Sequence, residues 1–323
     1  MGTVTESAFR PAWWLPGPHL QTLWPSLMRR RPRLELRRER VELGDGDFID
    51  LELGSGHGPT VVVIHGLEGG LESHYAAGTL AALEAGGFRP VFMYLRGCSG
   101  EPNRLPRAYH SGASDDLAAV LAHLARGPGG PPLAAVGFSL GGNLLLKYLG
   151  ETKEPLIRSA VAVSVPFVLR DAMLRLNIAS SVIYRNHLMR RLRDTYRRKR
   201  AVMPGLADLD LEAMRDFFDF DDQITAPLNG FAGANDYYAR CSCRPFLRQI
   251  TAPTLILHAR DDPFMFPRSI PSRDELGPGV RLELSRGGGH VGFVGGRLPW
   301  RPDYWIEGRI LAFLNIKHSL QLP

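Results

Sequence analysis

Cysteine is scarce in this chain of 323 residues, which contains only Cys98, Cys241 and Cys243. So few cysteines cannot build a disulfide framework. No cluster of histidines and cysteines with the spacing of a zinc site accompanies them. We therefore expect no zinc site, and we expect the protein to occupy a reducing compartment.

Long apolar runs are also missing. No run approaches the roughly 18 apolar residues that cross a membrane. The N-terminus lacks the basic stretch, apolar stretch and small-residue cleavage site of a signal peptide. These absences predict a soluble, cytoplasmic protein. At 44% hydrophobic residues, the chain is long enough for one large domain with an insertion or for two ordinary domains.

The positive charge is confined to two segments. The net charge is +6, but residues 185–200 hold eight lysines and arginines against one aspartate, and residues 29–40 hold seven arginines against two glutamates. Such segments are either solvated helix faces or sites for acidic surfaces. No nucleic-acid motif accompanies them, so we expect no nucleic-acid partner, and peripheral contact with an anionic membrane stays open as an alternative.

Apolar strand-like runs alternate with helix-like segments along most of the chain. The expected strands are at residues 61–64, 90–95, 133–136, 157–165, 253–258 and 280–284. The expected helices are at residues 73–85, 117–124, 142–149 and 304–316. Strands that are almost entirely apolar and alternate with helices predict an α/β fold with a mostly parallel central sheet covered on both faces.

The alternation breaks over residues 168–250. An insertion of this length is too long for a loop, so it predicts a folded helical cap over the strand ends. The resulting division has an N-terminal strap over residues 1–50, a core over residues 51–167 and 251–323, and the cap between the two core parts. The tryptophan-rich stretch at residues 13–25 is interpreted as part of the strap that packs on the domain, in preference to an interfacial anchor.

The pentapeptide Gly137-Phe138-Ser139-Leu140-Gly141 lies between an expected strand and an expected helix. A Gly-x-Ser-x-Gly motif in this context is the nucleophile elbow of an α/β-hydrolase, in which a sharp strained turn exposes the serine hydroxyl. Small residues flank the serine because strand and helix must approach closely. We therefore predict Ser139 as the nucleophile.

A serine nucleophile needs a base and a carboxylate that orients the base, both expected later in the chain. His290 follows a run of three glycines after the last expected strand, and it is the preferred base. Asp262 follows the preceding expected strand and is the preferred acid, with the adjacent Asp261 as a rival. The order Ser, Asp, His is that of the α/β-hydrolase fold.

Acyl transfer also needs hydrogen-bond donors for the developing oxyanion. The glycine-containing loop at residues 65–70 follows the first clear strand and is expected to approach the nucleophile. We predict that the backbone N–H groups of Leu67 and Leu140 form the oxyanion hole.

With these residues the chain resembles the YheT-like α/β-hydrolases. The shared motifs are Pro18-His19-Leu20-Gln21-Thr22, His65-Gly66-Leu67-Glu68-Gly69, Arg96-Gly97-Cys98-Ser99-Gly100, Tyr109-His110-Ser111-Gly112, Gly137 to Asn143, and Asp261-Asp262-Pro263-Phe264. The resemblance implies a serine hydrolase with esterase or acylglycerol lipase activity. It also implies a triad of Ser139, Asp262 and His290. Some relatives act as phospholipases or alcohol acyltransferases.

The sequence therefore predicts a serine hydrolase that cleaves small-molecule esters with short to medium acyl chains, such as monoacylglycerols. The mechanism requires no metal and no organic cofactor. Acyl transfer to an alcohol and phospholipase activity are the alternatives among enzymes. A binding protein for anionic surfaces, based on the two basic segments, is the alternative outside enzymes.

Overall fold

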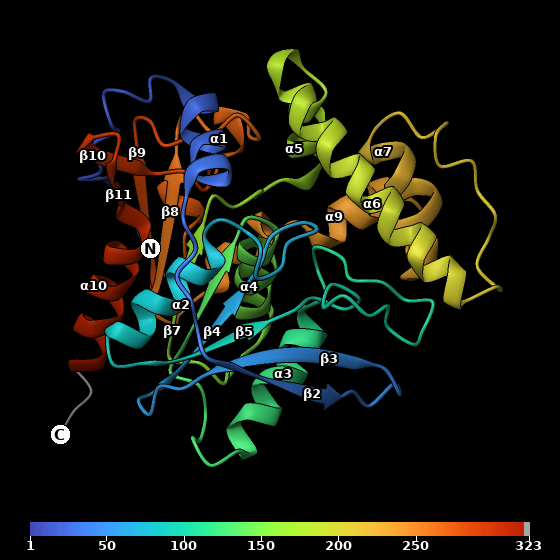
Figure 1. Ribbon diagram of the computed structural model, residues 1–323, viewed down its shortest axis with the longest axis horizontal. Coiled ribbons are helices and arrows are strands. Elements are labelled where there is room, and N and C mark those ends of the chain that lie inside the picture. The colour runs from blue at the N-terminus through green and yellow to red at the C-terminus, as the bar shows by residue number, and fades with distance from the viewer. Residues whose placement is uncertain (320–323) are drawn as a thin grey trace.

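A single mixed sheet forms the centre of the computed structural model, which describes residues 1–319 (Figure 1). In this part of the chain the sheet has nine strands in the order β1-β9-β8-β7-β6-β4-β5-β3-β2. All neighbours from β1 to β5 in that order are parallel, and β3 and β2 complete one edge in antiparallel pairing. The strands are β1 Thr3–Glu6, β2 Leu36–Glu42, β3 Phe48–Gly54, β4 Thr60–Ile64, β5 Arg89–Met93, β6 Ala134–Phe138, β7 Ser159–Val163, β8 Thr254–Ala259 and β9 Val280–Ser285.

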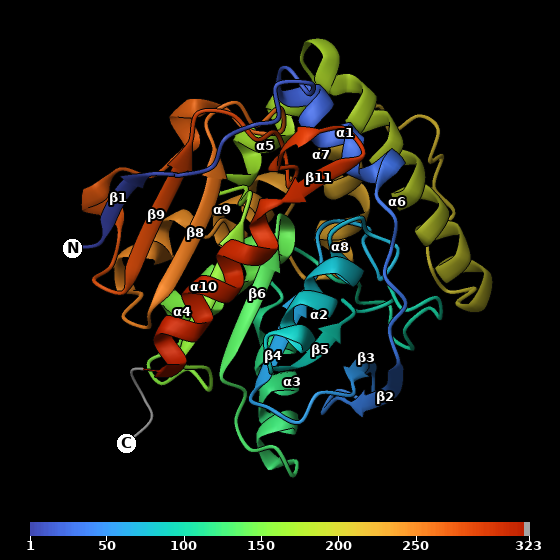
Figure 2. The same cartoon turned by 60° about the vertical axis from the view of Figure 1, so that its left-hand side comes forward.

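Helices cover both faces of this sheet, which confirms the expected α/β class. Along β4, Val61 and Val63 join one apolar cluster and Val62 and Ile64 join the other, because successive side chains of a strand point to opposite faces. The first cluster includes side chains of α2 (Ala76–Ala85) and α10 (Trp305–Ser319), which lie side by side (Figure 2). The second includes α3 (Ser114–Arg126) and α4 (Leu140–Glu151).

The segment between β7 and β8 is helical and has an apolar cluster of its own. Its elements are α5 Leu169–Leu176, a 3-10 turn Ala179–Ser181, α6 Val182–Val202, α7 Phe217–Phe220, a π-helical turn Asp221–Thr225, α8 Ala226–Leu228, α9 Ala234–Cys241 and a 3-10 segment Arg244–Gln249. Buried side chains of α5, α6 and α7 pack together in this cluster. Figure 1 shows these helices beside the sheet, and we refer to residues 168–250 as the helical insertion.

The first 50 residues contribute to the sheet itself, which differs from the expected strap. β1 pairs with β9 at one edge, β2 lies at the other edge, and the expected boundary at residue 50 falls inside β3. β1 and β2 were not predicted from the sequence, for a physical reason. An edge strand needs no continuous apolar run, and β2 carries three arginines and two glutamates in seven residues.

The rest of the N-terminal segment packs near the C-terminal part of the chain. Trp14 donates a hydrogen bond from Nε1 to the carbonyl oxygen of Gly296 (3.1 Å) and packs edge-on against Trp24. Gly296 belongs to a small hairpin of β10 (Val294–Leu298) and β11 (Arg301–Tyr304), and α1 (Pro18–Met28) is hydrogen-bonded to β10 through Gln21. Among residues 1–319, no helix has both the length and the apolar character needed to cross a bilayer.

Candidate active site

Ser139 lies in a tight turn between β6 and α4. Its backbone has φ 51° and ψ −117°, a left-handed conformation that L-residues rarely adopt, and its N–H donates to the carbonyl oxygen of Val163 (2.8 Å). A side chain at Gly141 would lie 2.5 Å from the carbonyl oxygen of His65, and one at Gly137 would lie 2.4 Å from that of Gly141. The two glycines of the motif therefore allow the close approach that forms this turn.

His290 connects Ser139 with Asp262. The His290 Nε2 atom is 2.9 Å from Ser139 Oγ, and His290 Nδ1 is 2.8 Å from Asp262 Oδ2. Asp262 is 3% exposed, and its second oxygen accepts the backbone N–H of Phe264 (2.8 Å). The Phe264 ring stacks on the imidazole with the ring centres 3.9 Å apart. The structure thus brings all three predicted residues into one hydrogen-bonded series.

The rival carboxylate, Asp261, has a different contact. Its Oδ1 atom accepts the backbone N–H of Gly289 (3.0 Å), in the turn that carries His290. Burial raises the pKa of the Asp261 carboxyl above its usual range. Asp261 therefore contacts the backbone of the turn, whereas Asp262 contacts the imidazole itself.

The N-terminal segment supports the turn that carries His290. This support was not predicted from the sequence. Thr22 Oγ1 accepts the backbone N–H of His290 (2.9 Å) and donates to the carbonyl oxygen of Pro18 (2.7 Å). Gln21 forms two hydrogen bonds with the backbone of Val294, through its side-chain nitrogen (3.0 Å) and oxygen (2.8 Å). The only signal in the sequence was the family motif at residues 18–22, which has no catalytic residue type that the mechanism lacked.

Replacing Thr22 with valine is expected to weaken both stability and ester turnover. The change leaves the buried N–H of His290 without an acceptor, which costs about 1–3 kcal/mol of unfolding free energy. A displaced imidazole should also lower kcat roughly tenfold, on the order of the loss that a small misplacement near the chemistry causes. Thermal denaturation and initial-rate kinetics measure the two effects.

Thr79→Val is the matched control for this prediction. Thr79 is 1% exposed, and its hydroxyl has no hydrogen-bond partner among residues 1–319. Its replacement by valine should leave activity and stability close to those of the unchanged protein. Equal effects of the two substitutions would contradict a positioning role for Thr22.

The loop at residues 65–70 leaves one backbone N–H free beside Ser139. The N–H of Gly66 donates to the hydroxyl of Tyr75 (2.8 Å), and the N–H of Glu68 donates to the hydroxyl of Tyr109 (2.9 Å). The N–H of Leu67, between them, has no hydrogen-bond partner in the described part of the chain. It is therefore available to a ligand.

Leu140 offers a second N–H group. It is the first residue of α4, where backbone N–H groups have no partner within the helix, and no side chain of the described residues caps this end. Leu67, Leu140 and Ser139 all border the same cavity. A side-chain carbon at Gly66 would lie 3.2 Å from Ser139 Cβ, so the loop at residues 65–70 runs directly beside the serine.

The other histidines near the strands have different environments. His65 Nε2 accepts the backbone N–H of Leu95 (2.9 Å), so its Nδ1 donates to the carbonyl oxygen of Gly66 (2.7 Å). Burial lowers the pKa of His65, of His258 and of His110 to about 4. In the described residues no group of three or more histidine, cysteine or acidic side chains is arranged to hold a metal ion.

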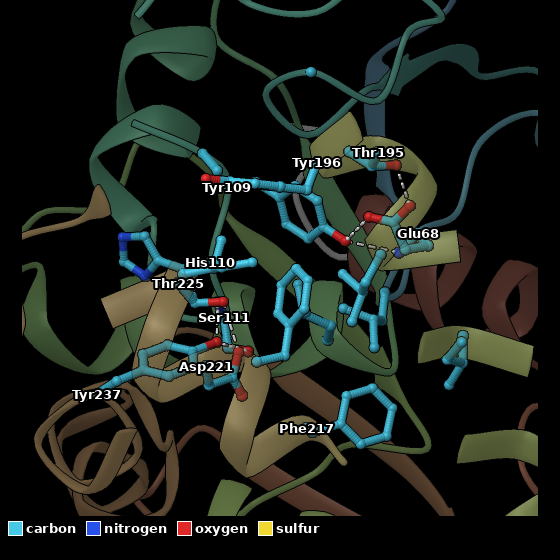
Figure 3. A pocket seen from close by; sticks show the side chains of 18 of the residues that line it. Glu68, Tyr109, His110, Ser111, Thr195, Tyr196, Phe217, Asp221, Thr225 and Tyr237 are labelled. Carbon is cyan, nitrogen blue, oxygen red and sulfur yellow. Dashed lines mark hydrogen bonds between the residues drawn. The ribbon is translucent and has the colours of Figure 1, made fainter. Parts of the chain in front are cut away.

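The helical insertion contributes a group of apolar side chains to the border of the cavity beside Ser139. These are Leu169, Ala172, Met173, Leu176, Leu188, Leu192, Phe217, Phe220, Ile224 and Leu228. Polar groups occupy other parts of its wall (Figure 3). One of them is Asp221, whose carboxylate accepts hydrogen bonds from Thr225 (2.6 Å) and Tyr238 (2.7 Å) and whose pKa is raised to about 6 by burial.

The basic segment at residues 185–200 lies on α6, and much of its charge is paired. The ion pairs join Arg191 to Glu72, Arg193 and Arg197 to Glu212, and Arg200 to Asp208. Lys199 is 5% exposed, donates to Asn103 Oδ1 (2.6 Å) and to the carbonyl oxygen of Arg107 (2.7 Å), and has its pKa lowered to about 8 by burial. Arg191 and Lys199 therefore join α6 to the core, whereas the pairs with Glu212 and Asp208 lie within the helical insertion.

A family model described as the alpha/beta hydrolase fold matches residues 59–296. The chain belongs to this family. Among curated relatives, this α/β-hydrolase is 44% identical over 306 residues to the Escherichia coli (strain K12) protein named "Putative esterase YheT". The match covers 92% of this chain and 90% of that protein. The resemblance to the YheT-like α/β-hydrolases is thereby confirmed.

Other similar proteins carry names of lipid-hydrolysing enzymes. The α/β-hydrolase is 30% identical over 318 residues to the mouse phospholipase ABHD3, a match that covers 93% of this chain and 76% of that protein. The solved Pyrococcus furiosus esterase Pf2001 shares the fold with a TM-score of 0.58 at 16% identity, over 89% of this chain and 97% of that one. The chain is thus an α/β-hydrolase of the esterase and lipase type.

Proposed function

We propose that this α/β-hydrolase is a serine hydrolase that cleaves carboxylic esters through an acyl-enzyme on Ser139. The observation that carries the proposal is the series of two hydrogen bonds from Ser139 Oγ through His290 to Asp262. A hydroxyl in contact with an imidazole, which in turn contacts a buried carboxylate, is the arrangement that activates serine as a nucleophile.

In the first half of the reaction, His290 Nε2 takes the proton from Ser139 Oγ while the oxygen attacks the ester carbonyl carbon. The carbonyl oxygen gains the electron pair of the broken π bond, and the N–H groups of Leu67 and Leu140 donate hydrogen bonds to it. His290 then returns the proton to the leaving alcohol as the ester bond breaks. Asp262 accepts the hydrogen bond from Nδ1 and stabilises the imidazolium cation.

In the second half, water takes the place of the alcohol. His290 removes a proton from the water as its oxygen attacks the acyl carbon. The second tetrahedral species then collapses, His290 gives that proton to Ser139 Oγ as the bond to the acyl carbon breaks, and the acid is released. Acyl transfer would follow the same steps with an alcohol in place of water. Assays with added glycerol or ethanol therefore report, through the ratio of ester to acid, which acceptor reaches the acyl-enzyme.

The apolar wall of the cavity supports an aliphatic acyl group as the part of the substrate that the helical insertion binds. Each methylene removed from water contributes roughly 0.8 kcal/mol. Short- to medium-chain esters, including monoacylglycerols, are the substrate class that we propose, and phospholipids are the second class because a relative is named as a phospholipase.

A series of p-nitrophenyl esters from acetate to palmitate, run beside monoacylglycerols and phospholipids, tests this assignment. We expect kcat/KM to rise up to about fourfold per methylene until the cavity is filled and then to fall. Ala172 borders the cavity from α5. The substitution Ala172→Leu adds side-chain volume to the cavity wall. The acyl length that gives the highest kcat/KM should therefore become shorter. A profile that does not change with chain length would contradict the acyl-binding assignment.

A further inference from the structure

Glu68 is a buried carboxylate in the loop at residues 65–70, and no cation among residues 1–319 pairs with it. Its side chain accepts a hydrogen bond from the hydroxyl of Tyr109 at Oε1 (2.7 Å) and from the hydroxyl of Thr195 at Oε2 (2.6 Å), as Figure 3 shows. The residue is 5% exposed, and its backbone has φ 50°. A glutamate rarely adopts this left-handed conformation, so contacts around it must hold it there.

Tyr109 binds Glu68 in two ways at once. Its hydroxyl donates to the Glu68 carboxylate and accepts the Glu68 backbone N–H (2.9 Å). Burial and the adjacent carboxylate raise the pKa of Tyr109 well above its usual range, so the hydroxyl keeps its proton. Because Glu68 directly follows Leu67, these two bonds fix the peptide next to the free Leu67 N–H.

The helix α6 extends along this same region. Thr195 contacts Glu68, Arg191 pairs with Glu72 (3.0 Å), and Lys199 donates to the carbonyl oxygen of Arg107, two residues before Tyr109. Residues 191, 195 and 199 are spaced by four and so lie along one face of the helix. One face of the helical insertion therefore contacts both the loop at residues 65–70 and the segment that carries Tyr109.

We propose that Glu68 and Tyr109 are positioning residues that hold the Leu67 N–H toward the oxyanion, and that Thr195 ties the helical insertion to this loop through Glu68. The proposal rests on the proposed serine hydrolase function. The helical insertion would then have a second role besides lining the acyl site. When α6 is docked, the hydrogen-bond series Thr195 to Glu68 to Tyr109 completes the oxyanion hole.

The substitution Tyr109→Phe tests the proposal. Loss of both hydrogen bonds should lower kcat about 10- to 100-fold, below the roughly 100- to 1,000-fold loss that follows complete removal of an oxyanion donor. KM should change less than threefold, because the donor acts on the transition state and not on the bound ester. The active sites are titrated first, so that the rates refer to folded protein.

Inhibition by a trifluoromethyl ketone gives a readout that a purely structural role would not change. Ser139 Oγ adds to the ketone carbon, its proton passes to His290, and the ketone oxygen becomes the oxyanion that the two N–H groups bind. In Tyr109→Phe the inhibitor affinity should fall by the same factor as kcat/KM. Glu68→Gln keeps the size of the side chain, and its kcat/KM and inhibitor affinity should also fall by one common factor. Thr195→Val should lower both quantities roughly threefold to tenfold.

Tyr148→Phe is the matched control. Tyr148 is 3% exposed, accepts the backbone N–H of Leu156 at its hydroxyl (3.2 Å) and does not border the cavity, so its replacement should leave kcat unchanged. A kcat for Tyr109→Phe within twofold of the unchanged protein, or a loss confined to KM, overturns the proposal. If the unchanged protein has no turnover that depends on Ser139, the proposed function fails first, and the two failures are thus distinct.

Discussion

Replacement of Ser139 with alanine is expected to lower kcat/KM for esters by a factor on the order of 10⁴ to 10⁶ without loss of the fold. The Ser139 hydroxyl forms its hydrogen bond with His290, and its backbone, which alanine can retain, forms the turn. The remaining activity would come from the oxyanion donors and substrate binding alone. Initial rates over a range of substrate concentrations give kcat/KM, and circular dichroism checks folding.

Ser159→Ala separates loss of the nucleophile from loss of any buried hydroxyl. Ser159 is 2% exposed in β7, and its hydroxyl has no hydrogen-bond partner in the described part of the chain. This variant should keep its activity. A fluorophosphonate probe should add one phosphonyl group at Ser139, as located by mass spectrometry. Labelling of another residue, or esterase activity retained by Ser139→Ala, would refute the assigned nucleophile.

Asp262→Asn is expected to lower kcat about 10³- to 10⁴-fold, whereas Asp261→Asn should lower it no more than about tenfold. An amide at position 262 can keep the hydrogen bond from the Phe264 N–H through its oxygen. It would then present its NH₂ group to His290 Nδ1, which favours the tautomer that cannot accept the serine proton. Asp261 contacts the N–H of Gly289, which the side-chain oxygen of asparagine can still accept.

The contrast between these two variants is the measurement that decides the acid. Both carboxylates follow β8, and both variants lose one negative charge, so a general electrostatic effect would be similar in each. Rates are measured from pH 5 to 9 and divided by the concentration of titrated active sites, so that a difference in the folded fraction does not affect the comparison. A larger loss for Asp261→Asn than for Asp262→Asn would reverse the assignment.

Most of the candidate site was predictable because its residues follow strands of one parallel sheet. Ser139 follows β6, Asp262 follows β8, His290 follows β9 and Leu67 follows β4. The carboxyl ends of parallel strands meet at the same edge, so strand order along the chain is enough to predict that these loops converge. Apolar runs and glycine turns mark such strands in the sequence because the strands are buried on both faces.

The supporting contacts could not be predicted in the same way. Thr22 contacts His290 across 268 positions of the chain, and Thr195 contacts Glu68 across 127. Neither threonine lies in a pattern that indicates a partner, because a single hydrogen bond leaves no periodicity in the sequence. β1 and β2 were missed for a related reason, since edge strands with exposed or charged side chains do not form apolar runs.

The sequence by itself determined the α/β class, the family and the set of candidate catalytic residues, because periodicity, turn glycines and the order Ser, Asp, His are all properties of the linear chain. Tertiary structure alone decided that Asp262 rather than Asp261 contacts the imidazole, and that basic side chains of α6 pair with Glu72 of the core and with Glu212 of the helical insertion. Both depend on the direction of individual side chains and on distances between remote segments. These emerge only when the sheet and the helical insertion pack together.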